Sequence, residues 1–273
     1  MRILIASGGA AQSNIAVQLG AQLARGTGGI APTLLTVIKH ESEYSRGQAI
    51  LTQAVDIMAL EKNTVSTKVR IGNPAKEIIS ESEEGGFDLI IVGSRPTHKL
   101  LTRLLGSTVE WVVSHAPCPV LIAKGNPTPI RRILLCVSGA DSPSHQTLFT
   151  ARFVHLVDVS HVTVLHVMSQ ISADPAPVQE WQLYASAAEL IQENQLEGQL
   201  LRQDILALAQ APGDVQPRIR HGPVVGEILA EAQDGVYDLI IIGAHQTRGW
   251  QRFLLDNLAH QIVVQADRPV LIV

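Results

Sequence analysis

The chain has 273 residues, of which 46% are hydrophobic, 17% charged and only 4% aromatic, and its formal net charge is −4. This length allows two domains of ordinary size, each with an aliphatic core. The small negative charge excludes a general attraction to nucleic acid or to an anionic membrane. The opening stretch MRILIASGG lacks the apolar run of a signal peptide, and no segment reaches the roughly 20 apolar residues of a membrane span. We therefore expect a soluble, cytoplasmic protein.

The first half of the chain alternates between short aliphatic runs and amphipathic segments. The predicted strands lie at residues 3–6, 33–38, 65–71, 89–92 and 120–123. The predicted helices lie at residues 15–24, 49–60, 74–82 and 107–114. Runs such as LIIV, at 89–92, are aliphatic throughout, which is typical of parallel strands covered by helices on both faces. Alternating strands and helices predict a right-handed, doubly wound sheet.

The second half of the chain repeats the first. FDLIIVGSRPTH at residue 87 returns as YDLIIIGAHQTR at residue 237, and RILIASGG at residue 2 returns as RILLCVSG at residue 132. Strands are predicted again at residues 133–137, 161–167, 216–220, 239–242 and 270–273. The sequence therefore predicts two tandem doubly wound, Rossmann-like α/β domains, each with a five-stranded parallel sheet of order 3-2-1-4-5. We place these domains at residues 1–124 and 131–273, joined by the Pro- and Gly-containing linker at 125–130.

The second copy carries about twenty extra residues, in the segment at 170–212. Its apolar side chains recur mostly every three or four residues, which predicts one long amphipathic helix. This helix either covers its own or the neighbouring sheet, or has a protruding part that serves as a dimer contact or partner site.

The two cysteines, Cys118 and Cys136, lie in apolar, strand-like surroundings. We predict that both are buried, reduced thiols rather than a disulfide or a reactive pair.

A candidate ligand site lies where the winding of the first sheet reverses. With strand order 3-2-1-4-5, the crevice opens at the carboxyl ends of the first and fourth strands. The start of the last helix, at residues 106–108, offers free backbone N–H groups and a partial positive charge to a phosphate. The candidate binding residues are Ser7, Gly8, Val37, Val92, Gly93, Arg95, Gly106, Ser107 and Thr108.

The stretches GNPAKEII at residue 72, DLIIVGS at residue 88 and GSTVEWVVSHAPCPVLIA at residue 106 resemble the universal stress protein family, in its tandem two-domain form. The resemblance covers nearly the whole chain. Nucleotide-binding members carry G-x2-G-x9-G-[ST], and the first copy keeps this spacing with Pro96 in place of the second glycine. The resemblance implies ATP in the first domain, with Mg²⁺ accompanying it, and association of the domains through their last strands.

The second copy departs further from this pattern. Asp256 and Asn257 replace the terminal Gly-Ser, and Gln246 replaces the second glycine. A carboxylate at a helix start competes with an anion for the same N–H groups and repels it. The second site is therefore predicted to be degenerate.

Three functional interpretations follow. The leading one is a non-enzymatic stress-response protein that binds an adenine nucleotide in its first domain, as a sensor or regulator with an unidentified protein partner and a possible homodimer state. The alternative is a nucleotide-free interaction scaffold with both crevices closed. A slow ATPase lacks a candidate base, since Glu77, Glu110 and Glu227 are interpreted as helix-surface charges.

Overall fold

The computed structural model describes residues 1–60, 64–94, 105–126, 128–138, 143–169, 184–243 and 257–273. The chain forms two compact units. The first consists of Met1–Pro129 and Ala244–Ile272, and the second consists of Ile130–Gly243 and Val273. In the described part of the chain, no helix combines the length and the apolar character that crossing a membrane requires.

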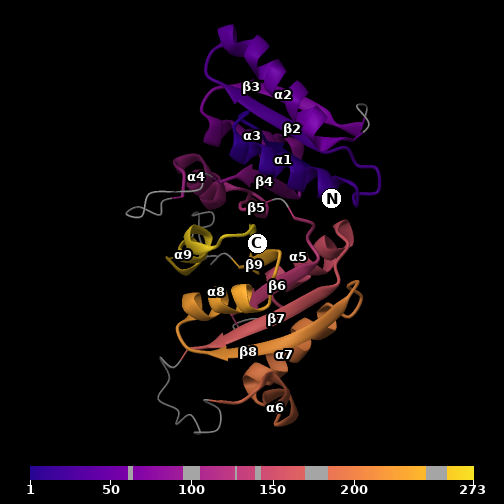
Figure 1. Cartoon of the computed structure of the whole chain (residues 1–273), viewed down its shortest axis with the longest axis vertical. Coiled ribbons are helices and arrows are strands. Elements are labelled where there is room, and N and C mark those ends of the chain that lie inside the picture. Colours follow the sequence, from indigo (N-terminus) through magenta and orange to yellow (C-terminus); the bar gives the residue numbers. More distant parts are fainter. Residues whose placement is uncertain (61–63, 95–104, 127, 139–142, 170–183, 244–256) are drawn as a thin grey trace. The chain divides into compact units, whose positions relative to one another are not determined.

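In its described residues, the first unit contains six strands and the helices that cover them. Figure 1 shows how these elements are arranged. Its described elements, in chain order, are β1 (Ile3–Ala6), α1 (Ala11–Ala24), β2 (Thr33–Ile38), the 3-10 helix η1 (Glu41–Glu43), α2 (Tyr44–Met58), β3 (Ser66–Ile71), α3 (Pro74–Gly85), β4 (Leu89–Gly93), α4 (Ser107–His115), β5 (Val120–Ala123), α9 (Asn257–Gln265) and β10 (Val270–Ile272).

The sheet of the first unit has the predicted winding. Its strands run in the order β3-β2-β1-β4-β5, and every neighbouring pair among them is parallel. The last strand of the chain, β10, adds to this sheet as an antiparallel neighbour of β5, with Leu271 opposite Leu121. The two stretches CPVLIA and RPVLIV, which correspond in the repeat, are thereby hydrogen-bonded to each other.

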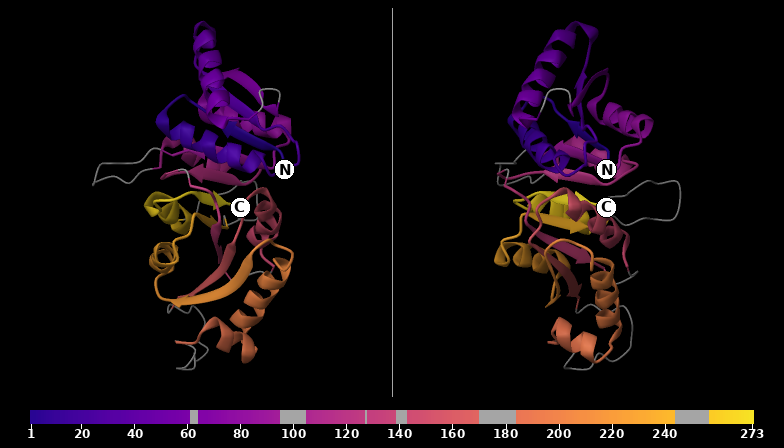
Figure 2. Two further views of the ribbon diagram at one scale, coloured as in Figure 1. Left: turned by 45° about the vertical axis from the view of Figure 1, so that its right-hand side comes forward. Right: turned by 90° about the vertical axis from the view of Figure 1, so that its right-hand side faces the viewer.

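Helices cover both faces of this sheet. α1 and α2 pack together on one face, and α3 and α4 pack together on the other (Figure 2). The central strands are consequently sealed from water, and Leu89, Ile90 and Ile91 have no exposed surface. Burial of these aliphatic side chains is the main force that stabilises the unit, at about 1.5–3 kcal/mol for each fully buried Leu or Ile.

The second unit repeats the arrangement. Its strands run in the order β8-β7-β6-β9, with parallel neighbours throughout, which confirms the doubly wound class and the first four strands of the predicted order for the second copy. The strand predicted as its fifth, at residues 270–273, is instead β10, which belongs to the first unit and pairs antiparallel with β5. α5 and α7 cover one face and α8 covers the other (Figure 2). Its described elements are β6 (Arg132–Val137), α5 (His145–Phe153), the 3-10 helix η3 (Val154–Leu156), β7 (His161–Met168), α6 (Ala187–Gln192), α7 (Leu196–Ala207), β8 (Asp214–His221), α8 (Val224–Asp234) and β9 (Leu239–Ile242).

The insertion is not the single long helix that the sequence predicts. In its described part it forms two helices, α6 and α7, with Asn194 between them in the left-handed conformation at φ 54°. Asn tolerates this backbone geometry better than most residues, so the chain turns there without a glycine. α7 packs on β7 and β8, where Leu201 is buried, and therefore covers the sheet of its own unit. Residues 170–183 lie outside the described part of the chain.

Both cysteines are free thiols, as predicted. Cys136 is buried, whereas Cys118 is only partly buried, so the prediction of a buried thiol is wrong for Cys118. Loss of hydration raises the pKa of Cys118 to about 12 and also raises the pKa of Cys136. Neither thiol is therefore ionised near neutral pH, and neither has the character of a reactive cysteine.

An arginine on the outer strand of the first unit binds three carboxylates of α3. Arg70 donates from Nε to Glu77 at 2.8 Å, from Nη1 to Glu81 at 2.7 Å and from Nη2 to Glu84 at 2.8 Å. The three acids recur every three or four residues and therefore lie on one helix face. Glu77 is thus an ion-pair partner that ties α3 to β3, and not simply a surface charge.

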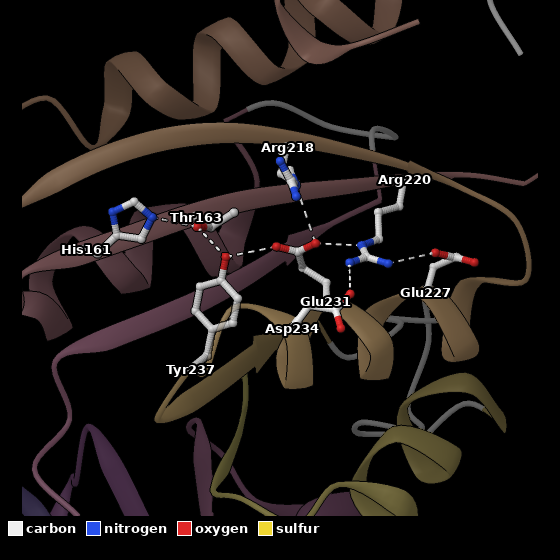
Figure 3. Close-up of polar contacts among 8 residues, drawn as sticks. All are labelled: His161, Thr163, Arg218, Arg220, Glu227, Glu231, Asp234 and Tyr237. Atoms are coloured by element: carbon white, nitrogen blue, oxygen red, sulfur yellow. Dashed lines mark hydrogen bonds and ion pairs between the residues drawn. The ribbon is translucent and has the colours of Figure 1, made fainter. Parts of the chain in front are cut away.

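The second unit repeats this cluster with Arg220 on β8 and three acids on α8 (Figure 3). Its central acid, Glu231, is 3% exposed and accepts from Arg220 Nε at 2.5 Å. Glu227 and Asp234 bind the remaining guanidinium nitrogens. The interpretation of Glu227 as a helix-surface charge is therefore corrected in the same way as that of Glu77.

A tyrosine extends the second cluster into the core. The hydroxyl of Tyr237 lies 3.1 Å from Glu231 Oε1 and 2.7 Å from Thr163 Oγ1, which in turn lies 3.0 Å from His161 Nε2 (Figure 3). Phe87 stands at the corresponding place in the first copy and has no hydroxyl. The buried carboxylate of Glu231 thus has partners for both oxygens, which offsets the cost of removing its charge from water.

We predict that Glu231→Gln lowers the free energy of unfolding by about 3–5 kcal/mol, because it removes the one buried carboxylate that pairs with the half-buried guanidinium of Arg220. Asp234→Asn is the matched control. Asp234 belongs to the same cluster but its side chain is 64% exposed, so its loss should cost less than about 1 kcal/mol. Urea titration of both variants at pH 7 measures the difference, and equal losses would contradict this account.

The same carboxylate predicts a pH dependence. Burial raises the pKa of Glu231, but the hydrogen bonds from Arg220 and Tyr237 and the nearby positive charge outweigh burial, so its pKa lies below the ordinary value of 4.5. A lowered pKa contributes stability that is present above 4.5 and is lost as the pH falls through the folded-state value. Between about pH 6 and pH 3, the wild type should therefore lose more unfolding free energy than Glu231→Gln. Parallel curves for the two proteins would refute the assignment.

Candidate functional site

A cavity of about 460 Å³ opens at the carboxyl ends of β1, β2 and β4 in the first unit. The starts of α1, α3 and α4 complete its wall. Eight of the nine predicted site residues line this one cavity, namely Ser7, Gly8, Val37, Val92, Gly93, Gly106, Ser107 and Thr108. The ninth, Arg95, lies outside the described residues, as do Pro96 and, in the second copy, Gln246 and Asp256.

One side of the cavity is apolar. Leu35 and Val37 on β2, Ile78 on α3 and Val92 on β4 form this side, and Leu35 and Val92 are almost completely buried. Apolar lining with a few placed polar groups is typical of pockets that hold a planar organic ring.

The opposite side of the cavity is the first turn of α4. Gly106 precedes this helix and provides no side-chain cap, whereas the start of α3 is capped by Asn73, which accepts from the N–H groups of Ala75 and Lys76. The first N–H groups of α4 therefore keep their capacity to bind an anion, reinforced by the positive end of the helix dipole. The hydroxyl groups of Ser107 and Thr108 add donors at the same wall.

Ser7 contributes a buried polar atom that lacks a partner within the structure. The residue is 4% exposed, and its Oγ makes no hydrogen bond to any described residue. A buried hydroxyl without a partner costs about 1–3 kcal/mol. Because Ser7 lines the cavity, a ligand there can supply the missing hydrogen bond.

Close packing fixes the base of the crevice at Gly93. A Cβ atom at this position would lie 2.2 Å from the carbonyl oxygen of Gln12, which shows how closely the start of α1 approaches the end of β4. In the second unit, Gly243 directly follows β9, and a Cβ there would lie 2.9 Å from the side-chain oxygen of Gln146. Gln146 also donates to the carbonyl of Cys136, so a side chain lies across the ends of β6 and β9.

The model of the universal stress protein family matches residues 1–124 and again residues 129–273. The chain belongs to the universal stress protein family. This universal stress protein is 23% identical over 253 residues to a universal stress protein of Mycolicibacterium smegmatis, which covers 89% of this chain and 81% of that relative. It is 31% identical over 87 residues to universal stress protein G of Shigella flexneri, of which the match spans only 57%.

Solved structures agree with the tandem fold. A universal stress protein from Archaeoglobus fulgidus superposes with a TM-score of 0.71 at 18% identity, covering 99% of this chain and 97% of that one. A functionally unknown protein from Pseudomonas aeruginosa superposes equally well, at 21% identity, covering 100% of this chain and 92% of that one. At these identities the similarity establishes the fold of both copies.

The structure brings together residues that the sequence identified, but it also contains a feature that sequence reasoning missed. The groove beside the cavity, between the starts of α3 and α4, includes Trp111. The available signal was a large aromatic side chain four residues after Ser107, which places both on one helix face.

We predict that Gly93→Ala destabilises the first unit by about 1–3 kcal/mol, because its methyl group would collide with backbone atoms that cannot rotate away. Gly8→Ala is the matched control. Gly8 lines the same cavity, but a Cβ there has no neighbour within 4 Å, so the change should stay within about 0.5 kcal/mol. Thermal unfolding of both variants tests this prediction, and similar melting temperatures would contradict it.

Proposed function

We propose that this universal stress protein is a non-enzymatic sensor or regulator that binds an adenine nucleotide, ATP, in the cavity of its first unit. The observation that carries the proposal is the pairing, within one cavity, of an apolar wall on β2 with an uncapped helix start on α4. These two environments match the two halves of a nucleotide, a planar base and a polyphosphate.

The fit can be followed residue by residue. The base lies against Leu35 and Val37, and the phosphates lie against the first turn of α4, with hydrogen bonds from Ser107 and Thr108. Ser7 Oγ supplies a further hydrogen bond from the end of β1. Gly8 and Gly106 have open space beside them, so a phosphate or ribose can approach the backbone at both positions.

The residues that line the cavity fit nucleotide binding better than nucleotide hydrolysis. Among the described lining residues there is no Asp, Glu or His that could activate a water molecule. Mg²⁺ keeps several waters and is commonly held by phosphate oxygens, so it would enter with the nucleotide and not through a carboxylate of this wall.

The alternative scaffold function requires both crevices to be closed, and the open cavity of the first unit argues against it. The domain limits at 1–124 and 131–273, the cytoplasmic location, the homodimer and the protein partner stay predictions.

Equilibrium dialysis with ATP and Mg²⁺ tests the proposal, and saturable binding is the expected result. Ser107→Asp places a carboxylate at the phosphate position and should weaken binding at least about tenfold. Ser45→Asp is the matched control, because it adds the same charge to an exposed first turn, that of α2, outside the cavity lining, and should leave binding unchanged. The absence of saturable binding at millimolar ATP would reject the proposal.

A further inference from the structure

A second, smaller groove adjoins the nucleotide cavity. It has a volume of about 230 Å³ and is lined by Asn73, Ala75, Lys76, Ser107, Thr108 and Trp111. Ser107 and Thr108 line both spaces, so only the first turn of α4 separates them. This volume is below the roughly 300 Å³ at which pockets for whole ligands begin, which suits it to one part of a larger ligand.

The groove ends on an aromatic platform. Trp111 is 44% exposed, although its indole is among the largest apolar groups of the chain. One face of the indole stacks on the His115 ring, with centroids 4.0 Å apart and planes inclined by 10°. The Nδ1 atom of His115 lies 2.9 Å from the carbonyl oxygen of Trp111, which fixes the imidazole on the helix.

The geometry of α4 determines which face of the indole is available. His115 lies one turn toward the carboxyl end of the helix, whereas Ser107 and Thr108 lie one turn toward its start. Helical side chains lean toward the amino end. The face of the Trp111 indole opposite His115 is therefore turned toward the groove. The stacking contact with His115 fixes the indole in a position where a second planar ring can stack on that face.

Charge at the groove favours a polyphosphate that passes through it. Lys76 is exposed at the first turn of α3, and within the described part of the chain it forms no ion pair. It lies beside the uncapped start of α4, so both the lysine and the helix dipole favour negative charge at the shared wall. Ser7, which is buried and has no hydrogen-bond partner among the described residues, offers a hydrogen bond to a ligand in the larger cavity.

We propose that the site binds a dinucleoside polyphosphate, with one base in the 460 Å³ cavity, the phosphates across Ser107 and Thr108, and the second base stacked on Trp111. This inference rests on the proposed nucleotide function. It goes beyond that function because ATP has no group that uses the free face of the indole.

Equilibrium dialysis of the full chain should compare diadenosine tetraphosphate with adenosine tetraphosphate and ATP. The two tetraphosphates share the phosphate chain and differ in the second adenosine, so tighter binding of diadenosine tetraphosphate isolates the second base. Trp111→Ala should weaken diadenosine tetraphosphate at least about fivefold and change ATP by less than about twofold. Tyr44→Ala, which removes another exposed aromatic ring of the same unit, should change neither.

The outcomes separate the two proposals. If ATP binds, but diadenosine tetraphosphate binds no more tightly than adenosine tetraphosphate, the second groove is not a base site and only the nucleotide function survives. If Trp111→Ala weakens both ligands equally, Trp111 acts through the structure of α4, and the dinucleotide inference is rejected. If none of the three ligands binds, the nucleotide function and the inference fail together.

Discussion

The reversal of winding between β1 and β4 is the constraint on which the first unit's site depends. β1 pairs with β2 on one side and β4 on the other, and the helices that follow β1 and β4 lie on opposite faces of the sheet. The two helix starts therefore diverge and leave a space at the carboxyl ends of the strands. Gly93 allows the start of α1 to close that space from below.

The site and the scaffold use opposite electrostatic arrangements. At the outer strands, Arg70 and Arg220 each form ion pairs with carboxylates of a neighbouring helix, so their charges are neutralised and hold the strand to the helix. At the cavity, the start of α4 and Lys76 lack such partners among the described residues. Positive potential is thus cancelled where it supports the fold and left available where an anion can bind.

Much of this could be predicted from the sequence, because the decisive signals are local or repeated. Aliphatic runs such as LIIV identify buried parallel strands, and the repeat fixes their order in both copies. The strand order then brings the ends of β1 and β4 and the start of α4 together. For this reason eight of the nine predicted site residues line the cavity. The ion clusters could not be predicted, since acids spaced every three or four residues also fit a solvated helix face.

Two further features depend on tertiary contacts that no local pattern reveals. The break at Asn194 divides the insertion into two helices, although no glycine or proline at that point indicates a break in the sequence. Trp111 follows a spacing that also fits a core position, whereas the structure leaves it 44% exposed at the groove between the starts of α3 and α4.

The antiparallel pairing of β10 with β5 has a consequence for how the chain acquires its structure during synthesis. The outer edge of β5 can form these hydrogen bonds only after Val270–Ile272 have left the ribosome, long after the rest of its sheet has been made. Until then an aliphatic strand keeps an open edge, which is the kind of surface that recruits foreign strands. The sheet of the first unit is therefore complete only at the end of synthesis, and a cut at residues 125–130 would leave this edge of β5 to pair with a separate fragment.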